Sequence, residues 1–188
     1  MDESIFSQIP ILETKHYVLR GLAVGDAQAI YPFLTDPETM KYITPHPIQS
    51  VAEVEDYVEN CLSKYREQKE IPWVIESKEE KQTVGIFRFH KVNLWHQKAE
   101  MGVVIHPQFQ GKGVMNELLA TLLPFGFNDL GLNRVVGDIF ADNKASEKLL
   151  LNYNFHKDGQ LRQTDFDGTT FHDTVVYSLL KSEFVNEG

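Results

Sequence analysis

The stretch HPQFQGKGV, residues 106–114, places two glycines around one lysine between two patterned segments. Before it, residues 98–107 (KAEMGVVIHP) alternate as a strand does. After it, residues 113–129 carry apolar side chains at helical spacing, at positions 114, 115, 118, 119, 122 and 123. We therefore expect a strand, a tight glycine turn and a helix N-terminus in succession. Such a turn suits phosphate, because glycines let the backbone approach closely and a helix N-terminus favours an anion.

Two familiar nucleotide loops do not fit this stretch. A Walker loop needs Ser or Thr directly after its lysine, but Gly113 and Val114 follow Lys112. A dinucleotide fingerprint needs a third glycine, where this chain has Asn116. What remains open at this point is a different phosphate site or an ordinary strand-to-helix turn.

The rest of the chain alternates between strand and helix patterns. Strands are expected at 16–22, 133–140 and 169–180, with 159–168 as a hairpin partner, and as a pair within 72–92 around a charged turn at 78–81. Helices are expected at 24–36 with Asp26 as the cap, at 38–43 as a short piece, at 50–70 from a Ser50–Glu53 capping box, and at 143–154. Pro124 is expected to kink or shorten the helix that follows the glycines. This order predicts an α/β chain on a mixed central sheet, organised as a single domain over residues 1–188.

Composition narrows the class of partner. The chain has 18 Lys+Arg against 27 Asp+Glu, a net charge of −9, and no basic stripe, so we expect no nucleic-acid partner. No apolar run is long enough to span a membrane, and no secretory signal is visible. A single cysteine, Cys61, offers neither a disulfide framework nor a metal site, and the histidines lack metal-ligand spacing. A cytoplasmic protein without metal is the expectation.

Four segments in order resemble one family. Residues 108–113, QFQGKG, fit the pattern [QR]-x-x-G-x-[GA], which is similar to the acyl-CoA loop of the GNAT family of N-acetyltransferases. LETKHYVLRGL, FADNKASEKLLLNYNF and FHDTVVYSLLKSEF resemble, respectively, the opening strand, the N-x-x-S helix and the last strand of its RimJ/RimL-like branch. The resemblance covers nearly the whole chain. It implies the GNAT fold, a mixed and mostly antiparallel sheet with helices on both faces, within the α/β (α+β) class.

The resemblance also implies acetyl-CoA as co-substrate and a set of cofactor-binding residues. The loop and the following helix N-terminus would receive the CoA phosphates, a backbone N–H of the preceding strand would polarise the acyl carbonyl, and Asn143 would orient pantetheine. The expected cofactor-binding residues are Val103, Val104, Ile105, Gln108, Gln110, Gly111, Lys112, Gly113, Val114, Asn143 and Ser146. As simple helix caps, Asp142 or Asn143 would instead satisfy free N–H groups.

Two residues are expected to be catalytic, Glu100 and Ser146. Glu100 shares one strand face with Gly102 and Val104, where many family members carry a general-base glutamate; it would act as base or bind the substrate amine, unless it only pairs with Lys98 or Arg88. By resemblance, Ser146 would protonate the departing thiolate. The tyrosine that many members use for this step is replaced by Leu150, which leaves Tyr153 a second candidate. Cys61, on an apolar helical stripe without a neighbouring His, is expected in the core.

Aromatic residues divide between packing and substrate contact. We expect Trp73, Phe87, Phe89 and Trp95 in the core or a cleft wall, and Phe33, Tyr42 and Tyr57 near the acceptor.

The predicted function is transfer of an acetyl group to a primary amine by direct attack in a ternary complex. The acceptor would be the N-terminal α-amino group of a protein, such as a ribosomal protein. The alternatives are a small amine, such as a polyamine or an antibiotic, and a non-catalytic acyl-CoA sensor. The family leads us to expect a monomer or a homodimer.

Overall fold

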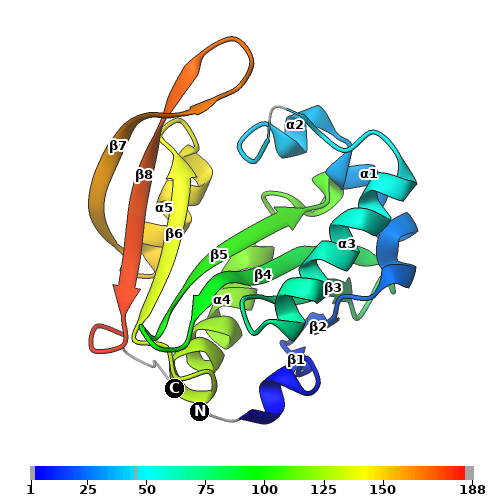
Figure 1. The fold of residues 1–188 in the computed structure, drawn as a ribbon, viewed down its shortest axis with the longest axis horizontal. Helices are drawn as coiled ribbons and strands as arrows, with labels where there is room; N and C mark the ends of the chain where they lie inside the picture. The colour runs from blue at the N-terminus through cyan, green and yellow to red at the C-terminus, as the bar shows by residue number, and fades with distance from the viewer. Residues whose placement is uncertain (1–2, 45, 185–188) are drawn as a thin grey trace.

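The computed structural model describes residues 3–44 and 46–184, and one eight-stranded sheet runs through it (Figure 1). The strand order is β1-β2-β3-β4-β5-β6-β8-β7. Only β5 and β6 run parallel, and the other neighbours are antiparallel. The strands are β1 (Leu12–Glu13), β2 (Tyr17–Gly21), β3 (Ile71–Ser77), β4 (Thr83–Asn93), β5 (Lys98–Ile105), β6 (Arg134–Phe140), β7 (His156–Phe166) and β8 (Phe171–Leu180). This confirms the predicted mixed, mostly antiparallel sheet.

Helices cover both faces of the sheet (Figure 1). The α-helices are α1 (Ala27–Leu34), α2 (Pro37–Met40), α3 (Val51–Arg66), α4 (Val114–Pro124) and α5 (Lys144–Asn152). Short 3-10 turns lie at Glu3–Phe6, Val24–Asp26 and Pro107–Phe109. One apolar core lies between α1, α3 and the sheet, and the other packs α4 and α5 against the opposite face. Burying a large apolar side chain stabilises the fold by about 1.5–3 kcal/mol, so these two cores fix which face each helix covers.

The predicted amphipathic stripe of α3 is confirmed. Val54, Val58, Cys61 and Tyr65 are buried, all on the face toward the sheet. The helix begins where expected, because the Ser50 side chain accepts a hydrogen bond from the backbone N–H of Glu53.

Asp26 stands at the N-cap position of α1, as predicted, but its side chain makes no capping hydrogen bond to that helix. A 3-10 turn over Val24–Asp26 precedes α1, so Asp26 is also the third residue of that turn, whose own N-cap position is occupied by Ala23. The Asp26 carboxylate accepts a hydrogen bond from the Ala23 N–H at 2.8 Å and pairs with both terminal nitrogens of Arg20. A buried carboxylate is retained there because a guanidinium satisfies it.

Pro124 shortens the α-helix, one of the two effects expected of it, although the helical segment continues beyond it. α4 runs up to Pro124, and the chain then continues as a π-helix, Phe125–Asp129, closed by the Leu130 N–H on the Phe125 carbonyl. Proline lacks an N–H and crowds the preceding turn, so the next turn widens instead of stopping.

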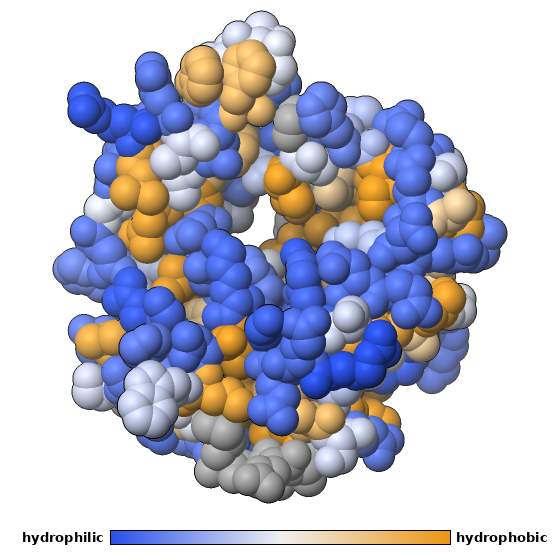
Figure 2. All heavy atoms as spheres, viewed as in Figure 1, coloured by the Kyte–Doolittle hydropathy of each residue, from blue (hydrophilic) through white to orange (hydrophobic). Residues whose placement is uncertain are grey.

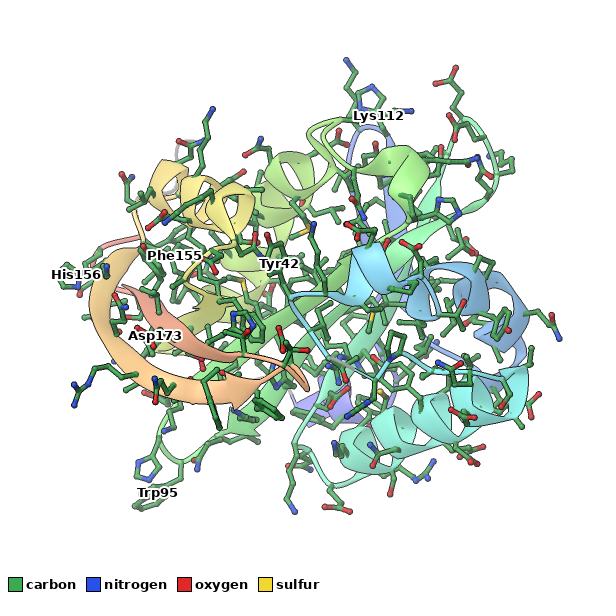
Figure 3. All side chains as sticks on the ribbon, turned by 90° about the horizontal axis from the view of Figure 1, so that it is seen from above. Tyr42, Trp95, Lys112, Phe155, His156 and Asp173 are labelled. Carbon is green, nitrogen blue, oxygen red and sulfur yellow. The ribbon has the colours of Figure 1, made fainter. Side chains whose placement is uncertain are left out.

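Trp95 is the one large aromatic that the packing prediction placed wrongly. Trp73, Phe87 and Phe89 are fully buried, whereas Trp95 is 89% exposed in the turn between β4 and β5. Trp95 lies in the turn 94–97 and points away from the molecule at its edge (Figure 3), so its indole stays exposed.

β5 and β6 are paired over three residues only and then part. The register joins Lys98, Ala99 and Glu100 to Arg134, Val135 and Val136, while β5 stays paired with β4 as far as Ile105. From Met101 onward one edge of β5 therefore has no partner strand. Figure 2 shows the molecule hollowed in its middle, between the half that contains β6–β8 and the half that contains α1 and α3.

Candidate active site

The glycine turn 111–113 follows β5 and ends in the N-terminus of α4. Gly111 and Gly113 have positive φ angles of 71° and 79°, and Gly113 is the left-handed N-cap residue of α4. No side chain caps this helix, and a Cβ at either glycine would meet no atom within 4 Å. The first N–H groups of a helix have no intrahelical acceptor, so this open N-terminus is suited to an anionic group.

The other predicted loop residues support this geometry in different ways. Val114 is buried and anchors α4, while Gln108 and Lys112 are exposed. The Gln110 side chain donates a hydrogen bond to the carbonyl of Ile105 at 2.9 Å, which closes the loop onto the end of β5. The Lys112 ammonium lies 5.5 Å from the Phe109 ring centre, at the edge of the molecule opposite Trp95 (Figure 3). The loop thus exposes backbone N–H groups and the Lys112 ammonium to any ligand that approaches it.

Val103, Val104 and Ile105 lie on the part of β5 that β6 has left. The side chains of Val103 and Ile105 pack into the α4 core, and Val104 is buried in the α1–α3 core. Since these side chains are used in packing, what this stretch can offer a ligand is the backbone of its unpartnered edge.

Asn143 is the N-cap of α5, which confirms the prediction that Asp142 or Asn143 caps this helix. Its side-chain oxygen accepts a hydrogen bond from the Ser146 N–H at 3.1 Å. The Ser146 side chain is half-buried in the first turn of this helix. The Tyr153 hydroxyl donates to the carbonyl of Asn116 in α4, so it is already engaged. Of the two acid candidates, Ser146 is therefore the one left available.

Glu100 lies where β5 and β6 begin to part, on the face expected for it. Its carboxylate is 2.7 Å from the Lys91 ammonium, so its ion-pair partner is neither Lys98 nor Arg88. The reason is the register irregularity that the β4–β5 ladder shows between His90 and Asn93, just where Lys91 lies. A pocket of about 280 Å³ opens beside this pair, lined by Lys91, Lys98, Ala99, Glu100, Arg134, Val136, Asp138 and Val176.

Polar and charged side chains from β4, β5, β6 and the residue before β3 gather around Glu100. Most of them were not predicted from the sequence as site residues. We use the term polar cluster for Glu70, Arg88, His90, Glu100 and Asp138. Glu70, only 1% exposed, pairs with Arg88 at 3.0 Å. Asp138, on β6, has its pKa raised by burial and then by the charge of Glu100. The sequence did hold a signal, since Arg88 and His90 are two residues apart in the stretch 84–90, which is otherwise free of polar side chains.

Tyr57 and Cys61 of α3 pack against this cluster. The Arg88 guanidinium lies 5.6 Å from the Tyr57 ring centre, and Arg88 Nη1 is 3.9 Å from the Cys61 sulfur. Burial raises the pKa of the Tyr57 hydroxyl and raises that of the Cys61 thiol to about 11. A thiol that stays protonated at neutral pH is a poor nucleophile, so Cys61 is the core residue that its position predicted.

His90 lies directly across the β4–β5 ladder from Glu100. A Cβ at Gly102 would lie 3.2 Å from His90 Cδ2 and 3.3 Å from Nε2, so this edge of the ring covers the Gly102 backbone. Burial, followed by the charge of Arg88, lowers the pKa of His90 below its ordinary 6.5. The imidazole is therefore neutral at pH 7.

The aromatic residues expected near an acceptor lie in three different settings. Phe33 is fully buried, with its ring edge-on to His106. Tyr57 lies by the polar cluster. Tyr42 lies near the centre of the molecule when it is seen from above (Figure 3), and its ring contacts Phe140 of β6 edge-on at 6.2 Å. Tyr42 thus joins the two halves that the parted strands separate.

Comparison with known proteins defines the class to which this fold and site belong. Residues 16–156 match the model of the acetyltransferase (GNAT) domain, so the chain belongs to the GNAT family and is an N-acetyltransferase. It is 34% identical over 172 residues to an uncharacterized N-acetyltransferase, YoaA of Bacillus subtilis, covering 92% of this chain and 97% of that protein.

Two further relatives differ in the acceptor they are named for. A spermidine N(1)-acetyltransferase of Vibrio cholerae is 25% identical, with 89% of this chain and 95% of that protein covered. The structure of RimL, a ribosomal L7/L12 alpha-N-protein acetyltransferase in complex with coenzyme A, superposes with a TM-score of 0.84 at 18% identity, covering 91% of this chain and 98% of that one. The second likeness shows the shared fold alone.

Two features are absent from the described residues. Residues 3–44 and 46–184 contain no group of three or more His, Cys, Asp or Glu side chains placed to hold a metal ion. Within the same ranges, none of the helices has the length and apolar content needed to cross a membrane.

Proposed function

We propose that this chain transfers the acetyl group of acetyl-CoA to the α-amino group of a protein or peptide, by direct attack in a ternary complex. The observation that carries the proposal is the uncapped glycine N-terminus of α4 beside the parted edge of β5. The open space at Gly111 and Gly113 fits a phosphate group. The single buried cysteine favours a reducing compartment such as the cytoplasm.

The cofactor would be held mainly by backbone. In the proposal, the CoA pyrophosphate contacts the N–H groups at Gly111, Gly113 and Val114, and Lys112 adds a positive charge. The pantetheine arm follows the edge of β5 at Val103–Ile105, where a backbone N–H polarises the thioester carbonyl. Asn143 and Ser146, at the start of α5, would face it from the other half of the molecule.

Three chemical tasks follow from acyl transfer to an amine. The ammonium must lose a proton, the carbonyl must be polarised, and the departing thiolate must gain a proton. We assign Glu100 to the acceptor ammonium and Ser146 to the thiolate. Because Cys61 is buried with a raised pKa, an acyl-enzyme on the only cysteine does not fit, and direct attack does.

The charges near Glu100 support an α-amine over a polycation. Lys91, Lys98 and Arg134 line the same pocket as Glu100 and Asp138, and Arg88 lies close by. A polyamine would bring several positive charges toward these cations, whereas an α-amine brings one. An α-amine, with a pKa of about 8, is also easier to deprotonate than a lysine-like amine at about 10.4.

A polyamine acceptor is the second candidate. It is favoured by the similarity to a protein named as a spermidine acetyltransferase and by the two carboxylates of the pocket. Small amine antibiotics belong to the same class of cationic acceptor.

An acceptor screen tests the proposal. Release of the CoA thiol from acetyl-CoA is measured with peptides bearing free α-amines, matched N-acetylated peptides, spermidine and aminoglycosides. The proposal expects the largest kcat/KM for free α-amine peptides and none for the blocked ones. Preference for spermidine would establish the second candidate. Tight CoA binding without turnover of any amine would overturn the proposal that this site transfers an acetyl group to an amine.

Ser146→Ala tests the assigned acid. We expect kcat to fall about 100-fold, in the range of general acid catalysis, with the dissociation constant of CoA nearly unchanged. Ser50→Ala, a hydroxyl removed from another helix start, is the control and keeps full turnover. An unchanged kcat in Ser146→Ala would remove this residue from the mechanism.

A further inference from the structure

We propose that His90 is the residue that accepts the proton from the acceptor ammonium, and that Glu100 holds this ammonium beside it. The inference rests on the proposed function and deepens it. It assigns a catalytic role to the member of the polar cluster that lies on β4, directly opposite Glu100 on the neighbouring strand β5.

The position of the ring is the first argument. His90 covers Gly102, two residues past Glu100, which is the last residue of β5 paired with β6, and so lies near the point where the two strands begin to part. A side chain at position 102 would crowd the imidazole, because a Cβ there would lie only 3.2–3.3 Å from two ring atoms, closer than ordinary van der Waals contact. The glycine therefore leaves room for His90 above the backbone edge to which we assign the thioester.

The availability of the ring is the second argument. Neither ring nitrogen of His90 has a hydrogen-bond partner among residues 3–44 and 46–184, and the described side chains include no fully buried polar atom without a partner. The ring is half-buried, so its nitrogens are open to solvent or substrate. Glu100, in contrast, already shares its carboxylate with the Lys91 ammonium.

The charges that face His90 come from every neighbouring element. They are Arg88 and Lys91 on β4, Glu100 on β5, Glu70 before β3 and, farther away, Asp138 on β6, with Tyr57 and Cys61 of α3 beside Arg88. Burial and Arg88 hold the ring neutral at pH 7, while Glu100 and Glu70 act in the opposite direction. A neutral imidazole is the form that can take a proton.

The proposed step balances in protons and bonds. An ammonium proton moves to His90 and leaves to solvent, and the free amine nitrogen attacks the thioester carbon. The carbon–sulfur bond then breaks, with its electron pair remaining on sulfur. The proton that the new amide nitrogen sheds offsets the proton taken up by the thiolate, so the net reaction releases one proton.

The wild-type pH profile is the first test and needs no variant. With both substrates saturating, log kcat should fall with unit slope at acid pH, with a midpoint below 6.5. A profile that shows no acid limb at any pH at which the protein stays folded would overturn the role of His90. Absence of turnover with every amine would instead remove the proposed function, so the two failures are distinguishable.

Variants at position 90 are the second test. His90→Gln should lower kcat about 100-fold and remove the acid limb, with unchanged CoA affinity. His90→Ala should regain turnover when imidazole is added, a recovery that a merely structural role would not give. His96→Gln, in the exposed β4–β5 turn, is the matched control and should keep both kcat and its pH profile. Wild-type kcat in His90→Gln, or His90→Ala without any gain from imidazole, contradicts the proposal.

Discussion

The glycine loop that follows β5 and the polar cluster beside its first half are built from different materials. The loop consists of six consecutive residues whose backbone geometry, with two left-handed glycines, makes an open helix N-terminus. The cluster brings together side chains from β4, β5, β6 and the residue before β3, in which Glu70 pairs with Arg88 while Glu100 pairs with the neighbouring Lys91. A ligand shared by all members of a family can be held by a local backbone device. An acceptor that differs between members of a family can be recognised by side chains, because each of these can be substituted without changing the fold.

The largest expected effect concerns the ion pair of the polar cluster. Arg88→Met leaves the Glu70 carboxylate buried and unpaired, which costs about 3–5 kcal/mol of unfolding free energy. Urea unfolding measures this loss. Arg134→Met removes the more exposed pair with Asp158 and should cost less than about 1 kcal/mol. Equal losses in the two variants would mean that the cluster is no more tightly built than the surface.

A substitution in the loop should affect the cofactor instead. Gly113→Ala keeps the left-handed conformation at a cost of about 1–2 kcal/mol and places a methyl group where the phosphate would approach. We expect CoA to bind at least about tenfold more weakly, as titration calorimetry would show. Gly168→Ala carries the same strain in open space in the β7–β8 turn and should leave CoA affinity intact.

The next effect tests whether the cofactor site extends to Asn143 at the start of α5. Asn143→Ala removes the cap of α5 and should cost about 1 kcal/mol of stability, as Ser50→Ala should for α3. If Asn143 also contacts pantetheine, its variant alone will bind CoA more weakly. Thermal unfolding and CoA titration of both variants separate these roles, and an identical CoA affinity in both would leave Asn143 only a cap.

The smallest expected effect is that of Lys112. Lys112→Ala should weaken CoA binding about twofold to fivefold at low salt, since an exposed charge near a helix end contributes about 0.3–1 kcal/mol. The difference from wild type should shrink as salt screens the charge. Lys69→Ala, in the exposed segment between α3 and β3, should show no change, and a loss in Lys112→Ala that is insensitive to salt would argue against a phosphate contact.

The same contrast explains what could be predicted from the sequence. The loop, the Ser50 cap, the Asn143 cap and the face of Glu100 depend on neighbours within a few residues, and local spacing indicates them. The pairing of Glu100 with Lys91, and of Arg88 with Glu70, depends on how strands register and on where one strand bulges. No local pattern contains that information. The side-chain pairing of Asp26 was missed for a related reason, since its partner Arg20 lies on the preceding strand.

Cys61 has a practical consequence for the experiments above. It is fully buried, its pKa is about 11, and it is the only cysteine of the chain. Thiol-reactive dyes should therefore see released coenzyme A against a silent protein, even at high enzyme concentration. A cysteine introduced at the exposed Trp95 would then be the single site to take a fluorescent label, beside the turn that joins β4 to β5.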